Sequence, residues 1–263
     1  MSHPAIFHTI GEPLIVLSSV DSTNNYAMAQ VREGLAGHGT AYFALEQTAG
    51  KGQRGKSWIT RPGENIMVSI VIQPVGLQTS QQFLLSMAIA LACYDFFKKY
   101  AGDETRIKWP NDLYWRDRKA AGILIENRVE GLQGTGNGRQ NGGNWSWAVA
   151  GMGININQTV FAPGVRNPVS LKQITGKEFA VVELVKELCI AVEDRWQMLM
   201  SGKQAEIFRD YHGALYKLND TVKLKKEDSV FETMVCGVSS TGKLLTKDFM
   251  EREFEVGEVE WVF

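Results

Sequence analysis

Hydrophobic positions along this chain recur with two periods, one typical of helices and one typical of strands. Short apolar or β-branched runs between turn residues predict strands, and longer runs with helical spacing predict helices. A helix should follow the polar residues 22–25, which suit an N-cap, and end near Gly34 or Gly37. We expect strands at 14–17, 41–45, 65–72, 106–109, 120–129 and 145–156, and further helices at 83–100, at 181–200 and towards residue 211. Residues 106–109 and 120–129 should pair around the turn at 110–112.

The pattern changes after residue 215. Short alternating strands with glycine turns follow, at 222–224, 231–238, 244–245 and 254–262. We therefore expect one domain over residues 1–215 and a small β-barrel-like module over residues 216–263. Within the first domain, the Gly/Asn-rich residues 131–144 lie between two expected strands, which predicts a long hairpin loop.

Composition narrows the function classes. The 263 residues are 44% hydrophobic and 22% charged, as in ordinary globular proteins. A formal net charge of -1 disfavours a general nucleic-acid binder. Three dispersed cysteines argue against a disulfide framework or a cysteine zinc site, and we predict no metal-ligand set. No signal peptide and no bilayer-length apolar run are evident, so we expect a cytoplasmic protein without a membrane partner.

The segment Gly50–Trp58, with the sequence GKGQRGKSW, is a candidate anion-binding loop. Its glycines let backbone N–H groups approach an anion closely, and its three cations supply charge. The spacing is not that of a Walker A motif. A flexible solvated hairpin loop explains this segment equally well.

A second candidate segment runs from Lys108 to Glu126 and reads KWPNDLY, then KAAGILIE from Lys119. It places a cation, a carboxylate and an amide around one tight hairpin. Each residue taken alone has a structural explanation: Asn111-Asp112 as a turn, Trp109 as core and Lys119 as a solvated lysine. Taken together, these residues favour a functional site more strongly than any one of them does alone.

The two segments together resemble the biotin–protein ligases, or biotin–[acetyl-CoA-carboxylase] ligases. The family's GRGRRGRxW loop corresponds to 50–58, and its KWPND…KxxGILxE block corresponds to 108–126. Ser22-Thr23-Asn24, Gln47 and the run 151–157 follow in the family's order, so the resemblance covers roughly residues 14–263. It implies an α+β catalytic core, with helices packed on a mixed or antiparallel sheet, and a small C-terminal SH3-like β-barrel.

The resemblance also implies roles for particular residues. The ureido ring of biotin is a neutral urea, which needs both hydrogen-bond donors and acceptors. Hydroxyl and amide side chains provide both. Helix capping is a compatible second role for Ser22, Thr23 and Asn24. The implied biotin-binding residues are Ser22, Thr23, Asn24, Gln47, Lys51, Gly52, Gln53 and Lys119.

Further implied roles concern ATP and the reaction. The ATP-binding residues are Lys51, Arg54, Lys56, Trp58, which would stack on adenine, Asn111 and Asn155. The catalytic residues are Lys119, Asp112 and Arg54. Asn157 is expected to be structural, and Gly122 to allow close packing. The family often has arginine where this chain has Lys51, Gln53 and Lys56, which predicts a weaker grip on the adenylate.

The implied reaction uses biotin, ATP and Mg²⁺. Biotin would become biotinyl-5′-AMP, and a lysine ε-amine of a biotin carboxyl carrier protein or domain would then take the biotinyl group. That amine must lose a proton first, and Asp112 is the candidate to orient it or accept the proton. The chain could act as a monomer or a homodimer.

Three alternatives remain at this level. A lipoate–protein ligase uses the same adenylation logic. A DNA-binding repressor is disfavoured because the core begins by about residue 14, which leaves no room for three further helices. A nucleotide- or RNA-binding module built on the barrel is disfavoured by the near-neutral charge.

Overall fold

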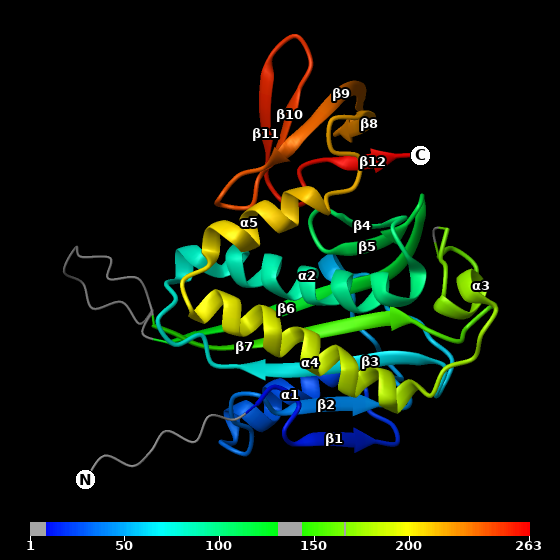
Figure 1. Ribbon diagram of the computed structural model, residues 1–263, viewed down its shortest axis with the longest axis vertical. Helices are drawn as coiled ribbons and strands as arrows, with labels where there is room; N and C mark the ends of the chain where they lie inside the picture. Colours follow the sequence, from blue (N-terminus) through cyan, green and yellow to red (C-terminus); the bar gives the residue numbers. More distant parts are fainter. Residues whose placement is uncertain (1–8, 131–143, 166) are drawn as a thin grey trace.

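A seven-stranded mixed sheet organises the larger part of the molecule (Figure 1). The computed structural model describes residues 9–130, 144–165 and 167–263. The strand order is β1-β2-β3-β7-β6-β5-β4, in which β1 and β2 are parallel and every other neighbouring pair is antiparallel. The strands are β1 Leu14–Leu17, β2 Ala41–Ala44, β3 Asn65–Ile72, β4 Thr105–Lys108, β5 Asp112–Trp115, β6 Arg118–Glu130 and β7 Asn144–Asn155. The expected α+β class is confirmed.

Strand β3 is buried at all eight positions because helices cover both faces of the sheet. Its residues Ile66 and Val68 belong to the main core with α2 and α4, whereas Val71 packs in a smaller core with Ala27 and Val31 of α1. The helices are α1 Thr23–Arg32, α2 Gln82–Ala101, α3 Leu171–Thr175, α4 Val181–Met200 and α5 Gln204–Gly213, with short 3₁₀ turns at Gln53–Gly55 and Thr79–Gln81. Figure 1 shows α2 and α4 side by side across one face of the sheet.

An arginine joins the three helices of this layer. Arg195 of α4 donates from Nε to Asp95 of α2 at 2.6 Å and from Nη1 to Asp210 of α5 at 2.8 Å. This contact lowers the pKa of Asp210, chiefly through the hydrogen bond from Arg195. The charged cluster therefore links the three helices to one another.

The prediction that residues 106–109 pair with 120–129 was wrong. Strand β5 lies between them: β4 pairs with β5, and β5 pairs with β6. Lys108 stands opposite Asp112, so the turn takes three residues and the chain re-enters the sheet at once. A second tight turn, with Arg116 at φ 52°, then leads into β6. Strand β5 begins at Asp112, a residue of the predicted turn, and lies between two tight turns, so no separate strand signal marks it in the sequence.

Strands β6 and β7 pair antiparallel over most of their length, which brings the segments 118–130 and 144–155 together as expected. The Gly/Asn-rich stretch itself falls on residues 131–143, outside the described residues.

A second, antiparallel sheet follows the core, with the order β11-β10-β9-β8-β12. Its strands are β8 Thr221–Lys226, β9 Ser229–Val238, β10 Leu244–Lys247, β11 Glu251–Phe254 and β12 Glu260–Val262. The single strand expected over 254–262 is two strands, because the turn at Gly257, with φ 87°, interrupts it. In Figure 1 this sheet sits above the β4–β5 hairpin, where Trp109 Nε1 donates to Gly242 O at 2.9 Å. Among the described residues, no helix is long and apolar enough to cross a membrane.

Candidate functional site

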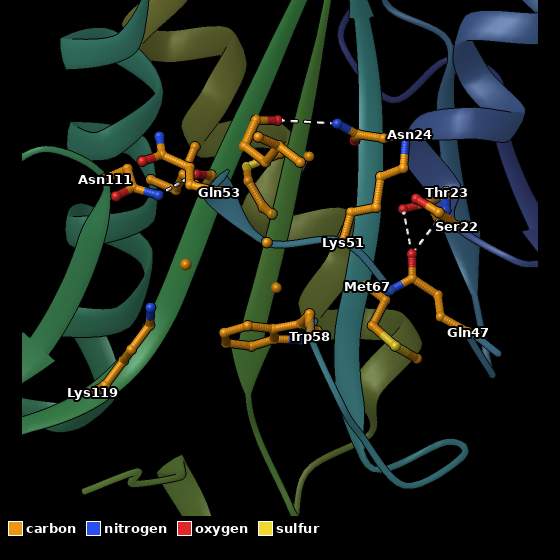
Figure 2. Close-up of a pocket in the computed structure, with 17 residues that line it drawn as sticks. Ser22, Thr23, Asn24, Gln47, Lys51, Gln53, Trp58, Met67, Asn111 and Lys119 are labelled. Atoms are coloured by element: carbon orange, nitrogen blue, oxygen red, sulfur yellow. Dashed lines mark hydrogen bonds between the residues drawn. The ribbon is translucent and has the colours of Figure 1, made fainter. Parts of the chain in front are cut away.

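A cleft opens over the middle of the large sheet, between the start of α1 and the segment 50–58 (Figure 2). It holds about 470 Å³ of empty space, part of which is open to solvent. Strands β3, β6 and β7 form its floor. Ten residues that were assigned from the sequence to biotin or ATP binding line it: Ser22, Thr23, Asn24, Gln47, Lys51, Gly52, Gln53, Trp58, Asn111 and Lys119.

The start of α1 contributes three buried polar residues at one end of the cleft. Ser22 occupies the N-cap position, but in the described structure its side chain makes no capping bond, so the capping prediction holds for position only. Thr23 donates from its backbone N at 2.8 Å and from Oγ1 at 3.1 Å to Gln47 Oε1. The helix end therefore orients the Gln47 side chain through its Oε1 atom and leaves its amide nitrogen out of these two hydrogen bonds.

Asn24 is fixed on three sides. Its Nδ2 donates to Leu124 O at 3.2 Å and to Glu126 Oε2 at 2.8 Å, and its Oδ1 accepts from Ser69 Oγ at 2.6 Å. Gly151 lies directly beneath: a Cβ there would stand 2.1 Å from Asn24 Oδ1. This end of the cleft is a preformed set of neutral hydrogen-bonding groups.

Two cross-strand glycines form a flat floor for Trp58. Gly122 of β6 stands opposite Gly153 of β7. An added Cβ would lie 3.2 Å from the Trp58 ring at Gly122 and 2.5 Å from it at Gly153. The close packing expected of Gly122 is confirmed. Trp58 Nε1 is buried without a hydrogen-bond partner in the described residues.

Lys119 lies beside Trp58, with its Nζ 3.5 Å from where a Cβ at Gly122 would stand, and it carries the cleft's closest ion pair. Its Nζ lies 2.6 Å from Asp112 Oδ1 and 5.8 Å from the Trp58 ring centre. The β4–β5 turn is held beside it, since Asn111 Nδ2 donates to Ile123 O at 2.7 Å. Asn155 donates to the backbone of Lys119 at 3.4 Å and of Val169 at 3.1 Å. Asp112 and Asn155 thus contact the cleft through Lys119.

The segment 50–58 is a small hairpin over the cleft. Gly52 N donates to Lys56 O at 2.6 Å, and Trp58 N donates to Gly50 O at 2.8 Å. Lys51 Nζ lies 3.8 Å from Glu126 Oε1. Arg54 turns away: its guanidinium lies 2.5 Å from where a Cβ at Gly257 would stand. As far as the described residues define the cleft, Arg54 and Lys56 lie outside its lining.

Ser69 was not identified from the sequence, and Glu126, Gly151 and Gly153 lay in recognised motifs but were given no role there. The glycines carried a signal, because positions 151 and 153 share one face of a strand and leave that face without side chains. Ser69 gave none, since a lone serine in an apolar strand is not distinctive. Asn157, expected to be structural, exchanges hydrogen bonds with the backbone of Phe179 at 2.8 and 3.0 Å.

No group of three or more His, Cys, Asp or Glu side chains stands close enough to hold a metal ion within the described ranges. A Mg²⁺ ion that arrives with ATP needs no such cage, because phosphate oxygens and water complete its coordination.

Comparison with known sequences relates this chain to protein ligases that use biotin or lipoate. The sequence model of the Biotin/lipoate A/B protein ligase family matches residues 16–136. A biotin–[acetyl-CoA-carboxylase] ligase of Paracoccus denitrificans is 36% identical over 191 residues, which are 69% of this chain and 72% of that protein.

Other relatives are covered less completely. The bifunctional ligase/repressor BirA of Escherichia coli is 37% identical over 116 residues, so the match spans 44% of this chain and only 35% of that protein. Among solved structures, the biotin protein ligase of Aquifex aeolicus in complex with biotin and ATP has a TM-score of 0.76. That alignment covers 94% of this chain and 97% of the other at 23% identity, which supports the fold.

Proposed function

Because the chain belongs to the family of biotin–[acetyl-CoA-carboxylase] ligases, we propose that it joins biotin to a lysine of a biotin carboxyl carrier protein or domain, using ATP. The observation that carries the proposal is the composition of the cleft: neutral hydrogen-bonding side chains at one end, and a lysine–aspartate pair with a basic loop at the other. A molecule with a urea at one end and a carboxylate at the other matches this distribution of groups.

At the neutral end, Ser22, Thr23, Asn24 and Gln47 bind the ureido ring. The helix start adds backbone donors of its own, since the first N–H groups of a helix lack partners within it. The ring is recognised by hydrogen bonds that are already arranged before it enters, which limits the entropic cost of binding.

In the first step, the biotin carboxylate attacks the α-phosphorus of ATP, and pyrophosphate leaves. Lys119 lies between these two anions and offsets their repulsion; Lys51, Arg54 and Lys56 hold phosphates, and Trp58 stacks on adenine. Mg²⁺ enters with the phosphates. Positioning and charge neutralisation supply most of the catalysis, because this transfer needs little covalent help from the protein.

In the second step, the ε-amine of the carrier lysine attacks the biotinyl carbonyl, and AMP leaves. Asp112 orients that amine or takes its proton. Asp112 lies 2.6 Å from Lys119. Arrival of the amine and departure of AMP therefore both change the charge that surrounds this ion pair.

The remaining partners follow from the same proposal. The five-stranded C-terminal sheet acts as the SH3-like module of the family. The chain binds no specific DNA sequence, and a gel shift on the promoter of the organism's biotin genes tests this. Sedimentation with and without biotin and ATP distinguishes a monomer from a homodimer.

One experiment tests the activity directly. Purified protein is incubated with biotin, Mg·ATP and a biotin carboxyl carrier domain, and the carrier is weighed by mass spectrometry. We expect the mass gain of one biotinyl group, dependent on ATP. A parallel reaction with lipoate and a lipoyl domain provides the discriminating arm: modification there, and none of the biotin carrier, would replace this proposal with a lipoate–protein ligase.

A further inference from the structure

Glu126 belongs to the block that identifies the family, yet the proposed mechanism gives it no role. It lies on β6, two residues after Leu124, and its carboxylate joins two separate elements. Oε2 accepts a hydrogen bond from Asn24 Nδ2 of α1 at 2.8 Å, and Oε1 lies 3.8 Å from Lys51 Nζ of the basic loop. Both partners are side chains that line the cleft. Figure 2 shows the Lys51 side chain extending toward Asn24.

The two contacts differ in strength. Asn24 is 3% exposed, and its two amide hydrogens go to Glu126 and to Leu124 O. Loss of Glu126 would leave a buried donor unsatisfied, which proteins rarely tolerate. The contact with Lys51 is longer than a hydrogen bond, and the Lys51 and Glu126 side chains are 44% and 36% exposed. Such a pair is weak, so Lys51 can exchange one anion for another.

Lys51 also lies near a second carboxylate. The pKa of Asp21 is lowered, mainly because Asn25 donates a hydrogen bond to it, with a smaller contribution from the charge of Lys51. Of these two carboxylates, Glu126 is the one that holds the Lys51 ammonium group near Asn24. Arg54, three residues further along, lies instead against Gly257.

We propose that Glu126 is a positioning residue for biotin binding, which fixes the Asn24 amide with one oxygen and holds Lys51 over the cleft with the other. This inference rests on the proposed function, because it assigns Glu126 to the biotin end of that site. The part of the loop's ordering cost that concerns Lys51 is met before the ligand arrives, so binding is tighter. A lysine needs such help more than an arginine, since its single ammonium has no planar fork to fix its direction.

Three variants separate the two contacts. Glu126→Gln keeps an oxygen that can accept from Asn24 but removes the charge that holds Lys51. Glu126→Ala removes both contacts. Lys51→Met removes the other partner of the ion pair.

Isothermal titration with biotin, without ATP, measures the effect. We expect Glu126→Gln to raise the Kd by about 3- to 10-fold, as for loss of a partly exposed ion pair with its ordering effect, and Glu126→Ala by about 10- to 100-fold, because a buried amide then lacks its acceptor. Lys51→Met should match Glu126→Gln, and the double variant should be no weaker than either single one. Glu187→Gln is the matched control, since Glu187 pairs with Lys99 at 2.6 Å on the helical layer.

A second readout needs no ligand. Trypsin should cut after Lys51 several-fold faster in Glu126→Gln than in the unaltered protein or in Glu187→Gln, while the melting temperature of Glu126→Gln stays close to that of the control.

Two results would overturn the inference. In the first, Glu126→Gln binds biotin and resists trypsin like the unaltered protein. In the second, the Kd of the double variant rises by the product of the two single-variant effects, which would mean that Glu126 and Lys51 act independently. If the unaltered protein itself fails to bind biotin, the proposed function fails, and the trypsin comparison still decides whether Glu126 holds Lys51.

Discussion

The two ends of the cleft are built differently. At the helix end, Ser22, Thr23 and Asn24 are 2%, 4% and 3% exposed. Thr23 donates to Gln47. Asn24 accepts from Ser69 of the buried strand β3 and donates to Glu126 of β6. At the loop end, Lys51 is 44% exposed, and a short backbone hairpin with no apolar residue before Trp58 carries the charges. The first end can select a neutral ring by shape and hydrogen bonds. The second end is suited to an anion that arrives later and completes its contacts.

The largest expected effect is at the charged end of the cleft, where Lys119 pairs with Asp112. Lys119→Ala should lower adenylate formation by about 10²- to 10³-fold or more, because a preorganised charge at the reacting phosphate is lost. Stability should fall by only about 1 kcal/mol, as expected when an ion pair on the cleft wall is broken. ATP–pyrophosphate exchange measures the first quantity and urea denaturation the second.

Biotin binding without ATP serves as the control for this variant, and it should change far less than exchange does. Near-normal exchange would mean that Lys119 is a solvated lysine paired with Asp112 and nothing more.

A smaller effect is expected from disturbing the rigid end. Gly151→Ala would place a Cβ 2.1 Å from Asn24 Oδ1, so Asn24 must move and lose its bonds to Ser69 and Glu126. We expect the Kd for biotin to rise by about 10- to 100-fold, which corresponds to misplacing one or two buried hydrogen bonds.

Gly37→Ala is a suitable control for Gly151→Ala. A Cβ at Gly37 meets nothing within 4 Å, and biotin affinity should be unchanged. If Gly151→Ala binds biotin normally, the preformed end is more adaptable than its burial indicates.

A third effect concerns the loop end alone. Arg54→Met should raise the KM for ATP by about tenfold, because a charge-assisted phosphate contact is lost. Binding of biotin in the absence of ATP should be unaffected, since Arg54 lies against Gly257 and not in the cleft. Steady-state kinetics with Arg116→Met as a distant control provides the measurement. An unchanged KM would mean that Arg54 contacts the C-terminal part of the chain at Gly257 and does not bind phosphate.

The smallest effect is a change in loop order. Trypsin should cut at Lys51, Arg54 or Lys56 in the protein alone, and biotin with ATP should slow those cuts several-fold. Three nearby cations repel one another without an anion, and fixing each loop residue costs about 1–2 kcal/mol. Equal cleavage rates, with ligand binding confirmed by titration, would show that the loop is equally ordered in both states.

Much of the fold follows from local pattern. Helix α4 was predicted with its observed ends, Val181–Met200, because its apolar residues recur at helical spacing along one face. Strand β5 was missed because Asp112–Trp115 begins within the predicted turn and lies between two tight turns. The pairing of β3 with β7 also had no local signal, since it depends on which buried strands find one another across the chain.

The candidate site divides in the same way. The sequence by itself determined the chemical groups: hydroxyls and amides at 22–24 and 47, cations at 51–56, and the pair Asp112 and Lys119, whose identities are fixed by composition and motif. Only the tertiary structure decided their partners. Asn24 meets Glu126 across 102 positions, and Arg54 meets Gly257 across the boundary of the two sheets. The physical reason is that hydrogen bonds and ion pairs act over a few ångströms, so which groups they join is settled only when the sheet has brought distant strands together.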